Sequence, residues 1–179
     1  MKTIYFSLII ILFASCSHNS DISRYVKRQV GKTIVINEKQ IAPEDLTKID
    51  SLTDNSEFLM VTTVRENACA SCYYSLLLEL DSFIDSCRLD MMNCVVFVHE
   101  NYDEYVQLSE KFELSHIFII NDPEDSYTND NKLSRYTVDF RTFLVDKNKK
   151  IRLVGNPLVN MRVRSLYEKE IKEMCNRNQ

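Results

Sequence analysis

Glycine, proline and tryptophan are scarce in this chain of 179 residues, which has two glycines, three prolines and no tryptophan. Disordered and low-complexity chains are usually rich in glycine or proline, unlike this one. The chain also has no internal repeat. With 45% apolar residues, the composition therefore indicates a globular protein. Basic residues number 22 against 26 acidic ones, for a net charge of -4. This balance argues against nucleic-acid binding and against a polybasic membrane-surface role.

Long hydrophobic runs are also missing, apart from one short run near the N-terminus. Lys2 is followed by a mostly apolar stretch from Ile4 to Phe13 and then by Ala14-Ser15-Cys16. A permanent membrane helix needs about 20 apolar residues, so this run is too short to be one. A charged start, an apolar run and a small-residue site are typical of a signal peptide. A cysteine directly after the small residues is typical of the lipobox of bacterial lipoproteins, in which that cysteine is diacylated.

The sequence therefore predicts a signal peptide over residues 1–15, a lipidated tether over residues 16–30 and a single domain over residues 31–179. The alternative is a secreted chain, or a buried N-terminal strand, in which Cys16 occurs by chance. Ser17 after the lipid-bearing cysteine does not suggest retention at the inner membrane. We therefore expect a protein of the cell envelope, anchored to the outer membrane and facing the periplasm, where disulfides can persist.

Apolar β-rich runs alternate with helical patterns along the rest of the chain. The predicted strands are residues 33–36, 58–64, 94–98 and 117–120, with a hairpin over 142–154. Helices are predicted at 24–30, from Pro43, around 76–84, at 103–112 and at 161–175, the last burying Val163, Leu166, Tyr167 and Ile171. Residues 121–139 are polar and predicted to be a loop. The alternating order predicts an α/β fold with a central mixed sheet flanked by helices.

Cys69-Ala70-Ser71-Cys72 stands between the strand at 58–64 and the long helical pattern that follows. Backbone N–H groups and the helix dipole stabilise an anion at such a place, so the pKa of the Cys69 thiol should fall. Cys69 would then attack a substrate disulfide, and Cys72, one helical turn later, would resolve the mixed disulfide. Half of a zinc site has the same spacing, but the preceding strand favours redox chemistry.

With these motifs the chain resembles the thioredoxin-like superfamily, in particular TlpA-like and peroxiredoxin-like bacterial lipoproteins of uncharacterised function. The resemblance covers about residues 57–175. Besides the cysteine motif, the matching segments are Phe118-Ile119-Ile120-Asn121-Asp122, Thr142-Phe143-Leu144-Val145-Asp146, Lys149-Lys150-Ile151, Gly31-Lys32-Thr33-Ile34 and Gly155-Asn156-Pro157 with Leu166-Tyr167. The resemblance implies a thioredoxin-like fold with the CxxC motif at the N-terminus of the first core helix, and it implies no cofactor.

Three departures from the family pattern bear on activity. Phe140, between Asp139 and Arg141, stands where most thioredoxin-like enzymes have a cis-proline. A cis bond without proline costs about 3 kcal/mol, so we expect a trans bond here. Thr63 stands near the position of the buried acid of thioredoxin and cannot relay a proton. Glu66 stands where a peroxidatic site has threonine, which disfavours peroxide reduction.

Nearby charges would tune the pKa of Cys69 in opposite directions. Arg65 would lower it, while Glu66 and Asp139 would raise it if they lie close. The alternative is that all three are solvated loop residues. Tyr73 and Tyr74 form either an aromatic rim for a protein substrate or ordinary helix packing.

The other cysteines and two histidines offer further alternatives. Cys87 and Cys94 either form a second disulfide across a short loop or remain two buried thiols, and Cys175 has no obvious partner. The cysteine pair with His99 or His116 would suit copper(I) or zinc. A solvated histidine is the commoner arrangement and no second ligand pair is present, so no metal site is predicted.

Two functions from different classes fit the sequence. The first is a membrane-anchored thiol-disulfide oxidoreductase that cycles Cys69 and Cys72 against exported proteins or a redox partner protein. Potentials of known couples span roughly -270 to -120 mV, so Ala70-Ser71 between the cysteines suits a reductant or an oxidant. The second is a non-enzymatic binding or assembly module in which Cys69 and Cys72 form a structural disulfide. The missing cis-proline motivates this alternative.

Overall fold

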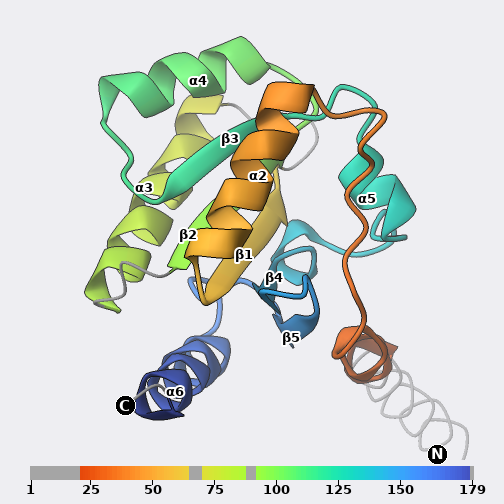
Figure 1. Cartoon of the computed structure of the whole chain (residues 1–179), viewed down its shortest axis with the longest axis vertical. Coiled ribbons are helices and arrows are strands. Elements are labelled where there is room, and N and C mark those ends of the chain that lie inside the picture. Colours follow the sequence, from red (N-terminus) through yellow and green to blue (C-terminus); the bar gives the residue numbers. More distant parts are fainter. Residues whose placement is uncertain (1–20, 65–69, 88–91, 178–179) are drawn as a thin grey trace, which may run out of the picture.

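Five strands form one mixed sheet in the computed structural model, which describes residues 21–64, 70–87 and 92–177. The strand order is β3-β2-β1-β4-β5, as Figure 1 shows. Strands β1 and β2 are parallel, as are β2 and β3, whereas β4 runs antiparallel to both β1 and β5. The strands are β1 (Phe58–Thr63), β2 (Met92–Val98), β3 (Ile117–Asn121), β4 (Phe143–Asp146) and β5 (Ile151–Val154). The predicted mixed sheet, with its parallel part and its hairpin, is confirmed.

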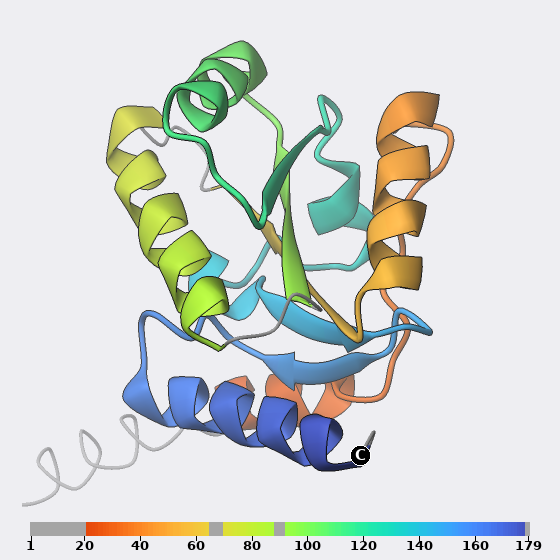
Figure 2. The same ribbon diagram turned by 60° about the vertical axis from the view of Figure 1, so that its left-hand side comes forward.

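Helices cover both faces of this sheet (Figure 2). Residues 21–29 are helical, and the later helices are α2 (Pro43–Asn55), α3 (Ala70–Ser86), α4 (Tyr102–Lys111), α5 (Ser126–Asp130) and α6 (Met161–Arg177). Helices α3, α4 and α6 pack on one face, whereas α2, α5 and the helix at 21–29 pack on the other. None of the helices within the described residues is long and apolar enough to cross a membrane.

Side chains of β1 alternate between the two apolar cores. Phe58 and Met60 enter the core under α3, while Leu59 and Val61 enter the core under α2. All six residues of β1 are buried. A strand covered on both faces needs apolar side chains in both directions, which explains its continuous apolar run. The prediction that this segment is covered on both sides is confirmed.

The predicted strand at 33–36 is wrong. Thr33 forms an isolated antiparallel bridge with Lys150, and Ile34 N donates to Lys149 O at 2.9 Å. The next residue leaves the sheet edge because the Asn131 side chain bonds both Val35 N, at 2.9 Å, and Val35 O, at 2.8 Å. The side-chain amide of Asn131 thus takes the place of a neighbouring strand at Val35. The segment around Thr33 is only a short partner at the β5 edge of the sheet.

The segment 121–139, predicted as a polar loop, contains α5 and the first two residues of the 3₁₀ turn Val138–Phe140. Asp122, only 1% exposed, causes the chain to turn into α5. Its carboxylate accepts hydrogen bonds from Ser126 N at 2.8 Å, Ser126 Oγ at 2.6 Å and Tyr127 N at 2.8 Å. Composition misled the prediction because the Asn/Asp-rich stretch hides two fully buried apolar side chains, Tyr127 and Leu133.

Helix α6 buries a narrower face than predicted. Tyr167 and Ile171 are buried, and Tyr167 Oη donates to Gly155 O at 3.0 Å. Leu166 is 51% exposed, so its predicted place in the core is wrong. Successive helical residues are about 100° apart, so Leu166 points away when its neighbour Tyr167 faces the sheet.

Cys87 and Cys94 are both free thiols, so the predicted alternative of a disulfide between them is not formed. Cys94 belongs to β2, is fully buried and lies in the core on the α3 side of the sheet. Burial, followed by the charge of Asp81, raises the pKa of Cys94 far above its ordinary value. Burial also raises the pKa of the half-buried Cys87. Both thiols therefore behave as small apolar side chains. The side chain of Cys175 lies outside the described residues.

Substitution of Asp122 by alanine should lower the free energy of unfolding by about 3 kcal/mol, because it leaves buried donors without their charged acceptor. Urea denaturation followed by circular dichroism measures this change. Glu124→Ala, an exposed carboxylate in the same segment, is the matched control and should change stability by less than about 0.5 kcal/mol. Equal losses in both variants would contradict the assigned role of Asp122.

The pKa of Cys94 predicts a loss of stability at alkaline pH. Because the folded-state pKa lies above the unfolded value near 9, the stabilisation is complete below pH 9 and is lost as the pH rises beyond it. Between pH 9 and 10 the wild type should lose up to about 1.4 kcal/mol per pH unit more than Cys94→Val. Urea titrations of both proteins at several pH values test this, and parallel pH curves would disprove it.

Candidate functional site

Helix α3 begins near the carboxyl end of β1, the central strand of the sheet. Ala70 is 2% exposed, and the backbone of Cys72 lies in the first turn of the helix. Tyr73 Oη donates to Thr63 O at 3.1 Å, which ties this first turn to the end of β1. Cys69, like Cys16, lies outside the described residues, as does the side chain of Cys72. The placement of the complete cysteine pair therefore stays a prediction.

The start of α3 is favourable for an anion. The helix has 17 residues, and no acidic side chain lies in its first turn. The positive end of the helix dipole is therefore not offset by a carboxylate of the helix itself. A thiolate at such a helix start is stabilised by the dipole and by the first backbone N–H groups, which have no acceptor within the helix.

The loop before β4 carries the residues predicted to replace the cis-proline segment. None of the peptide bonds of the described residues is cis, so the expected trans bond at Phe140 is confirmed. The 3₁₀ turn Val138–Phe140 leads into Thr142, whose Oγ1 lies 2.8 Å from Thr62 Oγ1 in a buried contact with β1. The loop is thereby fixed beside the same end of β1 from which the chain proceeds to α3.

The backbone carbonyls of this loop are bonded within the protein. Asp139 O accepts from Asn156 N at 2.8 Å, and Phe140 O accepts from Tyr25 Oη at 3.0 Å. Arg141 O accepts from Tyr127 Oη at 3.0 Å. The two tyrosine hydroxyls come from helices on the α2 side of the sheet. Sequence patterns did not reveal them, since Tyr25 lies 115 positions and Tyr127 lies 14 positions from its acceptor. Three successive carbonyls are thus occupied by internal donors.

Of the three charges expected near the cysteine pair, Asp139 is the one that the structure describes. Burial raises the pKa of Tyr73, and electrostatic interaction with the titratable side chains of Cys94, Tyr105 and Asp139 raises it further. The carboxylate of Asp139 is therefore within electrostatic range of the first turn of α3. Arg65 and Glu66 lie outside the described residues.

Arg141 contacts the segment that precedes the 3₁₀ turn. Its guanidinium donates to Tyr136 O at 2.8 Å and to Ser134 O at 3.3 Å, which holds the segment before the 3₁₀ turn. Thr63, at the position of the buried acid of thioredoxin, is 2% exposed and offers only a hydroxyl. That this residue is no proton relay stays a prediction.

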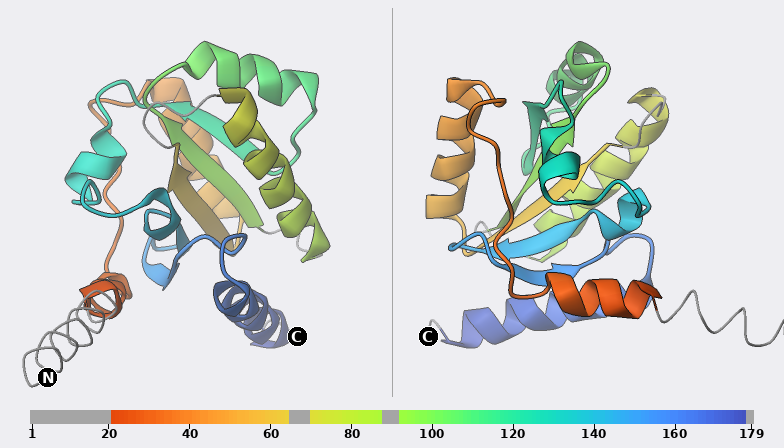
Figure 3. Two further views of the ribbon diagram at one scale, coloured as in Figure 1. Left: turned by 180° about the vertical axis from the view of Figure 1, so that it is seen from behind. Right: turned by 90° about the vertical axis from the view of Figure 1, so that its right-hand side faces the viewer.

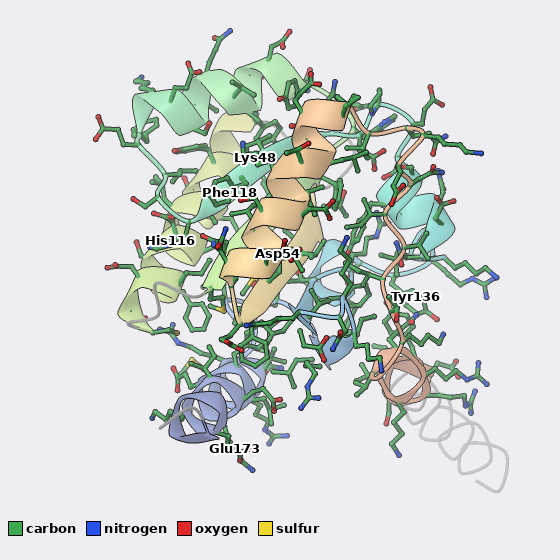
Figure 4. All side chains as sticks on the ribbon, viewed as in Figure 1. Lys48, Asp54, His116, Phe118, Tyr136 and Glu173 are labelled. Carbon is green, nitrogen blue, oxygen red and sulfur yellow. The ribbon has the colours of Figure 1, made fainter. Side chains whose placement is uncertain are left out.

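The two histidines weighed as metal ligands lie at opposite ends of the neighbouring parallel strands β2 and β3. His99 follows the carboxyl end of β2 and lies near Asp125, the pKa of which is raised by burial. His116 precedes β3, far from the start of α3 (Figure 4). Its backbone N–H donates to Asp81 Oδ1 at 2.7 Å. Within the described ranges, no group of three or more metal-ligating side chains is present.

The two tyrosines after the cysteine pair take part in helix packing. Tyr74 is 3% exposed, and its ring lies 4.9 Å from that of Phe112, just beyond α4. Tyr73 is partly buried, with its ring edge-on to Tyr105 at 6.3 Å. The packing alternative is therefore confirmed for Tyr74, and an aromatic rim is left with Tyr73 alone.

Comparison with solved structures identifies the fold. The crystal structure of a PrxQ mutant from Xylella fastidiosa matches with a TM-score of 0.52 at 10% identity, over 84% of this chain and 97% of the PrxQ chain. A thioredoxin-like protein from Bacteroides caccae matches with a TM-score of 0.44 at 11% identity, over 66% of this chain and 40% of its own. StoA from Bacillus subtilis matches with a TM-score of 0.38 at 13% identity, over 56% and 75%.

No protein-family model and no curated protein matches the chain. The PrxQ match extends over most of both chains and agrees with the mixed five-stranded sheet and its helices on both faces. At this level of identity the likeness shows the fold alone. The protein has a thioredoxin-like fold.

Proposed function

We propose that this protein is a thiol-disulfide oxidoreductase that acts through Cys69 and Cys72. The observation that carries the proposal is the first turn of α3, which includes Cys72, follows a fully buried strand and has no carboxylate of its own. A thiol at such a helix start is acidified by the dipole and becomes a nucleophile. The α/β fold, with PrxQ as a structural neighbour, agrees with this chemistry.

The exchange would proceed in two balanced steps. The Cys69 thiolate attacks one sulfur of a substrate disulfide, forms a mixed disulfide and releases the other substrate sulfur as a thiolate. Cys72, deprotonated, then attacks Cys69, releases the second substrate thiol and leaves the Cys69–Cys72 disulfide. Two electrons pass from the cysteine pair to the substrate, and the reverse sequence oxidises a substrate dithiol. Exported proteins or a redox partner protein would supply the substrate, and no cofactor is needed.

The same proposal places the protein on a membrane through a diacylated Cys16. The lipobox pattern before Cys16 supports this anchor, and Ser17 favours the outer membrane with the domain facing the periplasm. Residue 21, which lies in the first described helix, follows Cys16 by only five positions. The catalytic domain would therefore work close to the bilayer surface.

A binding or assembly module is the second candidate, and one observation favours it. The carbonyls of Asp139, Phe140 and Arg141 accept hydrogen bonds within the protein. A substrate that pairs with the loop backbone would find these acceptors occupied. In this alternative Cys69 and Cys72 form a structural disulfide, and the loop serves only to brace the fold.

Substitution of Cys72 by serine should trap the mixed disulfide on Cys69, because the resolving thiol is missing. Non-reducing electrophoresis of envelope fractions should show adducts for Cys72→Ser and none for Cys69→Ser. Cys87→Ser, which removes a thiol outside the pair, is the matched control and should behave as wild type.

The redox couple of the wild type separates the two candidate functions. An oxidoreductase requires a reversible couple between roughly -270 and -120 mV and a Cys69 pKa below the ordinary value of about 8.5. A pair that stays oxidised below about -300 mV, or a Cys69 that resists alkylation in the reduced folded protein, would establish the structural disulfide instead.

The anchor is tested separately by labelling cells with an alkyne fatty acid. Wild type should incorporate the label, and Cys16→Ala should incorporate none, because the thiol that accepts the lipid is absent. Cys87→Ala should label as wild type, since it leaves the lipobox intact. Full labelling of Cys16→Ala would refute the lipid assignment.

A further inference from the structure

A half-open groove of about 560 Å³ lies between the helix at 21–29 and the segment that follows α5. Figure 4 shows Tyr136 from that segment beside the helix, at the end of the molecule away from α4, and Figure 3 shows the backbone of the helix and the segment from two further sides. We call it the basic groove, after the charged side chains that line it: Asp21, Arg24, Arg28, Lys32, Lys132 and Arg135.

Positive charge in the basic groove is largely unpaired. Asp21 pairs with Arg24 at 3.0 Å, but both side chains are well exposed. Within the described part of the chain, no ion pair is formed by the other four cations, Arg28, Lys32, Lys132 and Arg135. Like charges gathered around one hollow repel one another, and this protein carries a net charge of -4. A local positive field on an acidic protein indicates a site for an anion.

Lys132 occupies a backbone position that favours glycine. Its φ is +58°, directly after the C-cap Asn131 of α5. Helices commonly end with glycine in this left-handed conformation because a side chain there strains the backbone. A lysine at this position strains the backbone where glycine would not, and Lys132 is one of the residues that line the groove.

The floor of the basic groove is rigid. The rings of Tyr25 and Tyr136 are stacked with centroids 3.6 Å apart. Tyr25 is further held by its hydroxyl on Phe140 O, and Tyr136 by the Arg141 guanidinium on its carbonyl. The cations consequently stand around a floor that needs no ordering when a ligand binds.

We infer that the basic groove binds the phosphate of an anionic phospholipid headgroup in the membrane that carries the protein, an inference that rests on the proposed lipid anchor at Cys16. The chain from Cys16 to Asp21 spans at most about 18 Å even if fully extended. The groove is thus held near the layer of lipid phosphates. Clustered Lys and Arg beside an anchor bind anionic lipids, and docking here orients the domain on the membrane.

The test follows acylation of single lysines in the full lipidated chain, reconstituted into vesicles. Phosphatidylcholine vesicles are compared with vesicles that also contain phosphatidylglycerol, and labelling is read by peptide mass spectrometry. Lys32 and Lys132 should react roughly fivefold more slowly on the anionic vesicles, and high salt should remove the difference. Lys111, exposed at the far end of α4, is the internal reference and should react equally on both (Figure 1).

Two glycine variants separate ligand binding from stability. Lys132→Gly should keep or raise thermal stability, because it relieves a left-handed backbone, yet lose most of the protection at Lys32. Lys149→Gly is the matched control, since Lys149 has a φ of +57° and pairs with Asp50 outside the groove. It should leave the protection at Lys32 unchanged.

Three outcomes would overturn the inference: equal labelling on both kinds of vesicle, equal protection by inorganic phosphate on phosphatidylcholine vesicles, or loss of protection in Lys149→Gly as large as in Lys132→Gly. The second outcome would assign the groove to a free phosphate. Failure of the anchor is recognised independently, because a chain without lipid would not associate with phosphatidylcholine vesicles. Protection of Lys32 on anionic vesicles would still support the groove in that case.

Discussion

Burial of β1 and β2 on both faces is the constraint on which the rest of the fold depends. Every residue of β1 is buried, and neighbouring side chains enter opposite cores. Apolar cover is therefore needed on two sides, and α3 with α4 supplies one side while α2 with α5 supplies the other. The parallel pairing of β1 with β2 also requires a crossover, which α3 provides. The first turn of α3 is consequently brought to the edge of the sheet by the same requirement that buries the strand.

The candidate site combines a helix start that suits a thiolate with a loop whose backbone carbonyls are already hydrogen-bonded. The first turn of α3 has no carboxylate, which suits an acidic thiol, but the carbonyls of Asp139, Phe140 and Arg141 are all bonded within the protein. Under the proposed function, the chemistry and the substrate contact would thus depend on different elements. Exchange at the cysteine pair is compatible with this loop if the substrate is held by side chains and not by backbone pairing.

Local patterns predicted the elements that depend on the chain nearby. Continuous apolar runs gave β1 and β3 within about one residue, and a trans bond at Phe140 followed from the energy of the peptide bond. Contacts between distant residues were not predictable. Asn131 ends the pairing of residues 33–36 from almost a hundred positions away, and Tyr25 reaches Phe140 across 115. Net charge likewise concealed the basic groove, because a sum over the chain says nothing of where charges gather.

The hydroxyl of Tyr25 links the chain near the proposed anchor to the loop beside the candidate site. Tyr25 lies in the first described helix, is 4% exposed and is bonded to Phe140 O. Mechanical tension applied at the N-terminus would therefore load this hydrogen bond and the tyrosine stack before it reached any strand. Under the proposed anchoring at Cys16, the loop would be the first part of the domain to sense a pull.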